Sequence, residues 1–239
     1  MCFNPLITWS TAGLGLATGV FAYAKQKPAT LYAPPAYFAF MEVLQGLMYT
    51  QLHHPEAWIV KILVYTAYVH VCFQPFVFNY WLSSFMGQNP IDRNTLTRHS
   101  YALKLCLCGA MFMALRMFII RDVTPLCSDY EALCKETPSV FFGEHHVAWA
   151  LPLIGGGWNY LFPSIFLHMF LFFIPSLLNG HHRISISFFL LGPYLAAKIT
   201  SNPHEQSSIW CVIGLWLLVL TVAAAFKKMP AFLLPKTKL

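Results

Sequence analysis

Charged side chains are scarce in this sequence of 239 residues, because Asp, Glu, Lys and Arg together make up only 10% of it. A soluble domain carries about 25% charged residues. Hydrophobic residues make up 57% of the chain, and several apolar runs reach the roughly 20 residues that a transmembrane helix needs. The deficit of charge therefore excludes an ordinary soluble domain and predicts an integral, multi-pass membrane protein.

Several motifs are also absent. The sequence has no HExxH motif, no CxxC pair and no Asn-x-Ser/Thr glycosylation site. The last apolar run, residues 207–226, has no lysine, which excludes a retinal Schiff base of the microbial rhodopsin type, and no HxxxH pair, unlike ceramidase-like and adiponectin-receptor-like hydrolases. The basic residues flank apolar runs and form no continuous patch, so the partner they favour is the lipid bilayer and not nucleic acid.

The apolar runs predict an all-α fold, in which a single domain over residues 1–239 forms a bundle of seven transmembrane helices. The fifth run is too long for one simple span, and we expect the glycines at 155–157 to break it. One long tilted helix and a short re-entrant piece before a helix are both compatible with it. The predicted spans are residues 5–24, 31–52, 57–81, 101–120, 147–178, 184–199 and 207–226.

The charges between these spans predict their orientation. If successive spans alternate in direction, one side of the membrane carries mainly bases, among them Lys25, Arg98 and Arg183, and its single acid is Asp92. The other side carries the remaining loop acids. Because Lys and Arg favour the cytoplasmic side, the amino terminus is predicted to be outside or lumenal and the carboxy terminus cytoplasmic.

Two cysteines, Cys127 and Cys134, fall in the long loop on the predicted non-cytoplasmic side. Disulfides persist in such compartments, and only six residues separate the two cysteines. We predict a Cys127–Cys134 disulfide that stiffens this loop. The alternative is a pair of unpaired loop thiols.

A polar stripe crosses the second predicted span. Glu42, Gln45, Gly46, Tyr49 and His53 fall within an arc of about 100° on one helix face. A carboxylate inside a membrane segment is costly and marks a candidate functional site. On the third span, His70 and Gln74 share a face through their i, i+4 spacing, at a depth similar to that of Glu42.

These depths predict a Glu42–His70 pair, with Asn159 beside the glycines facing the same cavity. Functionally, the pair is a candidate proton relay or part of a metal or substrate site. The structural alternative is an interhelical hydrogen bond that holds two helices together. A lone histidine among phenylalanines, His168, is expected to bond a neighbouring carbonyl group.

A second group of polar residues lies at the predicted outer face. His53 and His54 end the second span, Glu144, His145 and His146 precede the fifth, and Glu56, His204 and Glu205 lie on the same side. Imidazoles and carboxylates are suitable ligands for zinc or another divalent metal. Adjacent histidines point in different directions, however, so the alternative is a set of interfacial histidines bonded to water and lipid headgroups.

Three segments carry a resemblance: the opening Met1–Phe3, the Met41–Gln45 core and the segment His145–Trp149. They resemble those of an uncharacterised family of small seven-helix polytopic membrane proteins. The resemblance covers most of the chain, but it implies no established activity and therefore transfers no catalytic residue.

Three functional hypotheses follow from these features. The first is a transporter or receptor-like protein for a small solute or a proton, with its polar site between the second, third and fifth spans. The second is a membrane-embedded, metal-dependent lipid hydrolase that uses the outer histidines as ligands. The third is a non-catalytic accessory subunit that binds membrane-protein partners.

Overall fold

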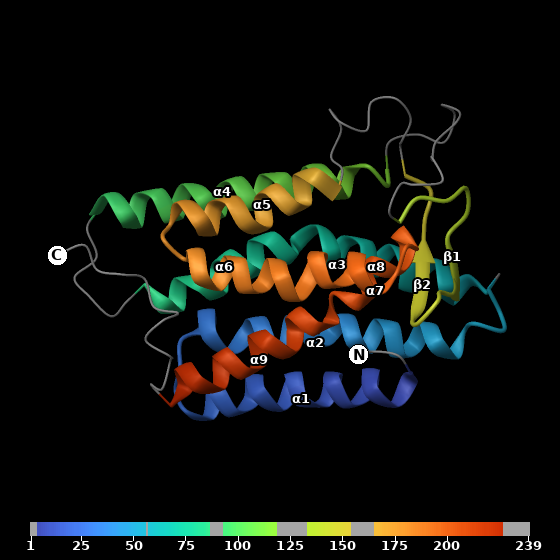
Figure 1. The fold of residues 1–239 in the computed structure, drawn as a ribbon, viewed down its shortest axis with the longest axis horizontal. Coiled ribbons are helices and arrows are strands. Elements are labelled where there is room, and N and C mark those ends of the chain that lie inside the picture. Colours follow the sequence, from blue (N-terminus) through green and yellow to red (C-terminus); the bar gives the residue numbers. More distant parts are fainter. Residues whose placement is uncertain (1–3, 56, 87–92, 119–132, 154–164, 227–239) are drawn as a thin grey trace.

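A computed structural model describes residues 4–55, 57–86, 93–118, 133–153 and 165–226. These residues are mainly helical, with one small two-stranded sheet (Figure 1). The elements are α1 Pro5–Ala24, α2 Ala29–Thr50, α3 Trp58–Leu82, η1 Ser83–Phe85, α4 Arg93–Leu115, β1 Ser139–Phe142, β2 Val147–Ala150, α5 Ile165–Leu178, α6 His182–Phe189, η2 Leu190–Tyr194, α7 Leu195–Ile199, α8 Pro203–Ile209 and α9 Cys211–Ala225.

The described helices group into seven rods, in agreement with the predicted number of helices. Helices α1, α2 and α3 lie within two residues of the predicted ranges. Helix α6, the π-helix η2 and α7 follow one another without a break, and Trp210 joins α8 to α9. The π-helix surrounds Pro193, where a proline interrupts regular α-helical hydrogen bonding.

Two predicted helices differ from the structure. Helix α4 begins at Arg93 instead of residue 101, because the polar segment before the apolar run is also helical. The run 147–178 does not begin as a helix, since Val147–Ala150 is strand β2 and pairs antiparallel with β1. Aromatic and β-branched residues such as Val140 and Trp149 favour this pairing, and the glycines at 155–157 lie outside the described residues.

An Asn-Pro pair begins both the first and the last rod. Asn4 Oδ1 accepts the Ile7 N–H at 2.9 Å, and Asn202 Oδ1 accepts the His204 N–H at 3.0 Å. Asparagine is a favoured N-cap residue, and proline suits the first helical position because its missing N–H is not needed there. Local sequence therefore fixes where these two rods start.

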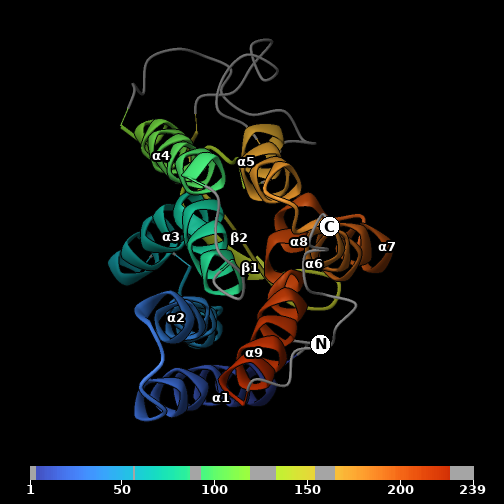
Figure 2. The same cartoon turned by 90° about the vertical axis from the view of Figure 1, so that its left-hand side faces the viewer.

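The rods lie along the long axis of the molecule, and the β1–β2 hairpin lies at one end of them (Figure 1). Helix α1 packs against α2, and α4 packs beside α5 (Figure 2). Helix α3 contacts α2, α4, α5 and β1. It is therefore the central element of the described fold.

Prolines inside α3 and α5 each leave one backbone carbonyl without its helical partner. Pro75 lacks the N–H that would bond to the Val71 carbonyl, and the His168 Nε2–H of α5 donates to that carbonyl at 3.0 Å. The expected role of His168 as a partner of a carbonyl group is confirmed.

The second carbonyl, that of Leu171 in α5, also accepts a hydrogen bond from the neighbouring helix. Pro175 cannot bond to the Leu171 carbonyl, and Asn79 Nδ2 of α3 donates to that carbonyl at 3.1 Å. Such replacement of lost backbone bonds by neighbouring helices is what allows proline inside helices in an apolar environment. The two exchanges also lock α3 to α5.

An aromatic core joins α3, α5, α6 and α9. Phe78 stacks on Phe172 with ring centroids 4.2 Å apart and lies 4.8 Å from Phe188. Trp81 is buried beside them, and its Nε1–H donates to the Thr221 hydroxyl at 3.0 Å. The one polar atom of this indole therefore has a partner, as burial of tryptophan requires.

Three helical stretches in the described part of the chain are long and apolar enough to cross a membrane: Pro5–Ala24, Trp58–Phe85 and Pro203–Ala225. Helix α5 contains a shorter apolar stretch, Phe166–Leu178. By length and composition, these helices agree with the predicted membrane location.

Close packing of α1 on α2 gives a first prediction. A β-carbon at Gly15 would lie 2.6 Å from Ala39 Cβ and 3.2 Å from the Pro35 carbonyl oxygen. Gly15→Ala should therefore force the helices apart and lower the free energy of unfolding by about 1–3 kcal/mol. Thermal unfolding of the purified protein in detergent, followed by circular dichroism, measures this loss.

Gly13→Ala is the matched control, because an added β-carbon there has no atom within 4 Å. It should leave stability unchanged or raise it by up to about 1 kcal/mol, as alanine favours the helix. Equal losses for the two variants would contradict the close packing.

Candidate functional site

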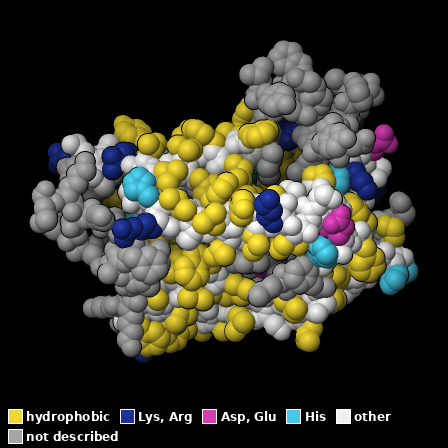
Figure 3. Space-filling model, viewed as in Figure 1, with side chains coloured by type: hydrophobic (Ala, Val, Ile, Leu, Met, Phe, Trp, Pro, Cys, Tyr) yellow, Lys and Arg dark blue, Asp and Glu magenta, His cyan; other side chains and the backbone are white. Residues whose placement is uncertain are grey.

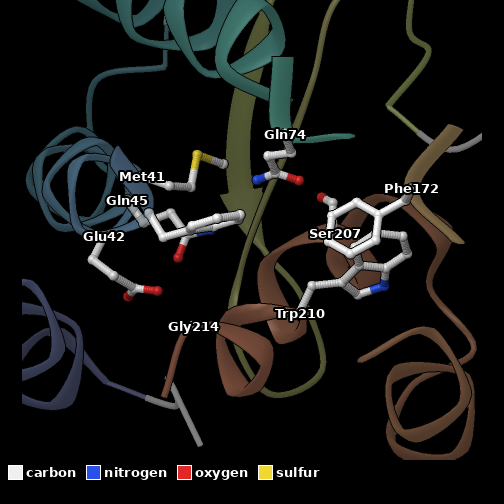
Figure 4. Close-up of a pocket in the computed structure, with 9 residues that line it drawn as sticks. Met41, Glu42, Gln45, Gln74, Phe172, Ser207, Trp210 and Gly214 are labelled. Carbon is white, nitrogen blue, oxygen red and sulfur yellow. The ribbon is translucent and has the colours of Figure 1, made fainter. Parts of the chain in front are cut away.

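A small polar cavity lies where α2, α3, α5, α8 and α9 meet (Figure 4). Its volume is about 30 Å³. A buried polar cavity needs roughly 10–15 Å³ to hold a water molecule, so this one accommodates one or two. It is lined by Phe38, Met41, Glu42, Gln45, Gln74, Phe172, Ser207, Trp210 and Gly214.

The polar groups of the cavity come from three elements. Glu42 and Gln45 lie on one face of α2, and only 4% and 0% of their surfaces are exposed. Gln74 extends toward the cavity from α3, and Ser207 lines it from α8 (Figure 4). The structure thus brings together Glu42, Gln45 and Gln74, three of the six residues predicted for the intramembrane site.

His70 is placed elsewhere, against the backbone of α2. Its Nε2–H donates to the Tyr37 carbonyl at 2.8 Å, and the Tyr37 hydroxyl donates to the His70 carbonyl at 2.5 Å. The two rings stack with centroids 4.0 Å apart. His70 is not among the residues that line the cavity with Glu42, and its contacts are those of the structural alternative, a bond between two helices.

Tyr49 lies at the hairpin end of the α2 stripe and contacts the hairpin. Its hydroxyl oxygen accepts the Val147 N–H at 3.3 Å, and its ring lies 5.4 Å from the His146 ring. The stripe therefore has two parts: Glu42 and Gln45 face the cavity, and Tyr49 fixes the hairpin above it. The sixth predicted residue, Asn159, lies outside the described residues.

The hairpin turn is held by a buried carboxylate, that of Glu205. Glu205 has no exposed surface, and its oxygens accept the backbone N–H groups of three turn residues, Glu144, His145 and His146. The Thr200 hydroxyl donates to Oε2 at 2.8 Å. Charge-assisted hydrogen bonds of this kind are stronger than neutral ones, so Glu205 fastens the hairpin to α8.

Gly143 lets the carboxylate approach the turn. A β-carbon at this position would lie 2.5 Å from the Glu205 carboxyl carbon, well inside ordinary contact distance. The sequence signal for this site is a glycine followed by polar residues between two short β-favouring runs, but its partner is about 60 positions away.

The residues of the predicted metal site face different ways. His53, His54, Glu144 and His145 are exposed, whereas His146 is buried. His146 Nδ1–H donates to the Val147 carbonyl at 3.1 Å, and the Ser201 hydroxyl donates to Glu144 Oε1 at 3.0 Å. Among the residues that the structure describes, no three His, Cys, Asp or Glu side chains are grouped to hold a metal ion.

The predicted disulfide stays a prediction, because Cys127 lies outside the described residues. Cys134 is buried, and its Sγ lies 3.4 Å from the Leu153 carbonyl oxygen. The backbone at Cys134 also forms a bridge to Leu151, directly after β2. Cys134 is thus held next to the hairpin.

Sequence analysis missed part of the cavity wall. Ser207, Trp210 and Gly214 line it from the last rod, which we interpreted only as an apolar span. A serine and a glycine in that run are weak signals, because both residues are common in membrane helices.

Fold and site together define a mainly helical protein whose apolar helices are long enough to cross a membrane. Between these helices lies a cavity lined by a carboxyl group and two side-chain amides. Residues 7–231 match the family of unknown function DUF5765, and the chain belongs to this family. The resemblance to an uncharacterised family is confirmed to this extent, and the family assigns no activity. No curated protein and no solved structure matches the chain.

The Glu205 contacts predict a large effect of a small change. Glu205→Gln keeps the side-chain size but leaves one acceptor oxygen for the backbone donors of the turn, at a cost of about 2–3 kcal/mol. We expect the amides of Glu144, His145 and His146 to exchange their hydrogens at least about tenfold faster. Hydrogen exchange with mass spectrometry measures this.

Glu144→Gln is the control, since it neutralises an exposed carboxylate in the same turn. Its effect on stability should stay within about 0.5 kcal/mol. If Glu205→Gln left the exchange rates unchanged, the carboxylate would not be what holds the hairpin.

Burial of His146 predicts that the free energy of unfolding depends on pH. Burial lowers its pKa from 6.5 to about 4, against the opposing effects of the Val147 carbonyl and the Glu205 carboxylate. The folded state therefore binds the proton more weakly than the unfolded state. The stability from the neutral ring, about 3 kcal/mol, is present above pH 6.5 and is lost as the pH falls toward 4.

Thermal unfolding of the wild type and of His146→Gln is measured at several pH values between 6.5 and 4. The difference between the two proteins isolates the contribution of His146 from that of the other histidines. The wild type should lose more stability than His146→Gln as the pH falls. His145→Gln, at the exposed neighbouring position, should behave as the wild type does. Parallel curves for wild type and His146→Gln would refute the assignment.

Proposed function

We propose that this chain is a multi-pass membrane protein with seven spans, and that Glu42 carries protons through the cavity between α2, α3, α5, α8 and α9. The observation that carries the proposal is the buried Glu42 carboxylate on a cavity large enough for water. A carboxyl group inside a membrane domain is a typical component of a proton pathway.

The distribution of charge supports the orientation that we propose, with the amino terminus outside or lumenal. Lys25, Lys27, Arg93, Arg98 and Arg183 lie at the ends of α1, α4 and α6, away from the hairpin. Bases occur at both ends, but the described acids other than Glu42 lie toward the hairpin (Figure 3). Among the described residues, the end that carries bases has no acid, and by sequence only Asp92 adds one there, which suits the cytoplasmic side.

The size and lining of the cavity favour a proton over a larger solute. A volume of about 30 Å³ accommodates water and little more. The amides of Gln45 and Gln74 and the hydroxyl of Ser207 are able to hydrogen-bond such water beside Glu42. Tyr49 and the hairpin lie toward the outer end of α2, where a proton path would leave the membrane.

The hydrolase hypothesis receives no comparable support. It requires a group of metal ligands, and the described histidines at the hairpin end diverge. The proton-carrying role therefore stands as the function that the site supports best.

Proton flux in liposomes tests this proposal. Purified protein is reconstituted with a pH-sensitive dye inside, and a potassium gradient with valinomycin sets a membrane potential. Wild-type liposomes should acidify faster than protein-free liposomes. Glu42→Gln removes the titratable group and should reduce the protein-dependent rate by about a hundredfold or more.

Two further variants complete the test. Glu42→Asp keeps a carboxyl group and should retain part of the rate, and Glu144→Gln, which loses an exposed carboxylate, should retain all of it. Thermal unfolding checks that each variant is folded. A wild-type rate equal to that of empty liposomes, or a full rate in Glu42→Gln, would refute the proposal.

A further inference from the structure

A second, larger hollow lies between α4 and α5, away from the Glu42 cavity. Its volume is about 320 Å³, at the lower end of the range for small-molecule sites. Its walls are apolar and open sideways, because Tyr101 and Leu105 of α4 and Phe170 and Leu178 of α5 line it and are exposed. We call it the α4–α5 groove.

Two polar residues, Arg98 and Asn179, line the groove at the end farthest from the hairpin. Arg98 Nε–H donates to Asn179 Oδ1 at 3.2 Å. This bond uses Nε–H and orients the guanidinium, whose remaining N–H groups are on its two terminal nitrogens. The groove therefore combines apolar walls with a cationic group at one end.

Two buried histidines near Asn179 in space or sequence, His99 and His181, have ring nitrogens without described partners. Asn179 Nδ2–H donates to His99 Nδ1 at 3.5 Å, which leaves the ring hydrogen on Nε2. Within the described residues, His99 Nε2 and both ring nitrogens of His181 have no hydrogen-bond partner, although the two residues are only 7% and 2% exposed. Unfilled buried donors are costly and leave room for an acceptor that the described residues do not provide.

Charge at this end of the molecule also favours an anion. Arg93, Arg98 and Arg183 lie in the first turns of α4 and α6. Among the described residues, the acids lie on α2, on the hairpin, in the segment before it and on α8, not at this end.

We propose that the α4–α5 groove binds an anionic phospholipid, with an acyl chain between α4 and α5 and its phosphate on Arg98 and Asn179. The apolar walls and the lateral opening suit an acyl chain. The bidentate geometry of a guanidinium suits a phosphate, and basic pockets between membrane helices are known to bind anionic headgroups. The inference rests on the membrane location proposed above and is independent of proton transfer by Glu42.

Binding is tested on the full chain in detergent micelles. Dioleoyl phosphatidylglycerol is titrated in, thermal unfolding gives an apparent affinity, and phosphatidylcholine with the same chains serves as the uncharged comparison. We expect a saturable stabilisation by phosphatidylglycerol and a weaker effect of phosphatidylcholine. Glycerol phosphate, which has the anion without the chains, should give no stabilisation.

Three variants examine the two halves of the site. Arg98→Gln should weaken binding of phosphatidylglycerol about fivefold, and Ala102→Trp, which fills the groove, should weaken binding of both lipids. The matched control is Lys104→Gln, which removes a base from the same helix outside the groove lining and should leave the affinity unchanged.

Arg98→Lys keeps the charge but loses the bidentate geometry, so its affinity should lie between those of the wild type and Arg98→Gln, which separates loss of binding from misfolding. Equal stabilisation by the two lipids, full affinity in Arg98→Gln, or equal losses in Arg98→Gln and Lys104→Gln would overturn the proposal. Competition by glycerol phosphate would assign the site to a free phosphate instead. Loss of proton flux with lipid binding intact would concern Glu42 alone.

Discussion

The packing of this molecule depends on backbone carbonyls that proline leaves without a donor. In an apolar environment such a group must find another partner, because water is not there to replace it. His168 serves the Val71 carbonyl and Asn79 serves the Leu171 carbonyl, in opposite directions across the α3–α5 interface. Rotation of either helix would break one of these bonds, and their directions thus set how α3 faces α5.

That rotation decides which side chains reach the interior. Gln74 of α3 and Phe172 of α5 both line the Glu42 cavity. Phe172 also stacks on Phe78 in the aromatic core. The cavity therefore borders the aromatic core, because Phe172 belongs to both.

Much of the helical architecture could be predicted from sequence, because apolar runs of sufficient length have few other solutions. The stripe of Glu42 and Gln45 follows from helical periodicity, which is a local property. The pairing of Glu42 with His70 failed to appear among the observed contacts because it required the relative rotation of two helices. Similar predicted depths of two residues restrict which residues are able to meet, but they do not determine how the two helices are rotated toward each other.

The hairpin shows a second limit. Its residues continue an apolar run, so hydropathy favoured a helix over Val147–Ala150, whereas the turn is held by Glu205. A contact between residues about 60 positions apart leaves no periodic signal. Glycine at 143 and the β-favouring residues on both sides were the local indications, and the alternation of spans placed Glu205 on the same side as Glu144 without pairing it to the turn.

Glu205 and Ser207 are two residues apart on one helix, yet the first holds the hairpin and the second lines the cavity. A displacement of the hairpin would therefore have less than one helical turn to cross before it reached the cavity wall. Under the proposed topology, an antibody against the turn would therefore act on the surroundings of Glu42 without touching that residue.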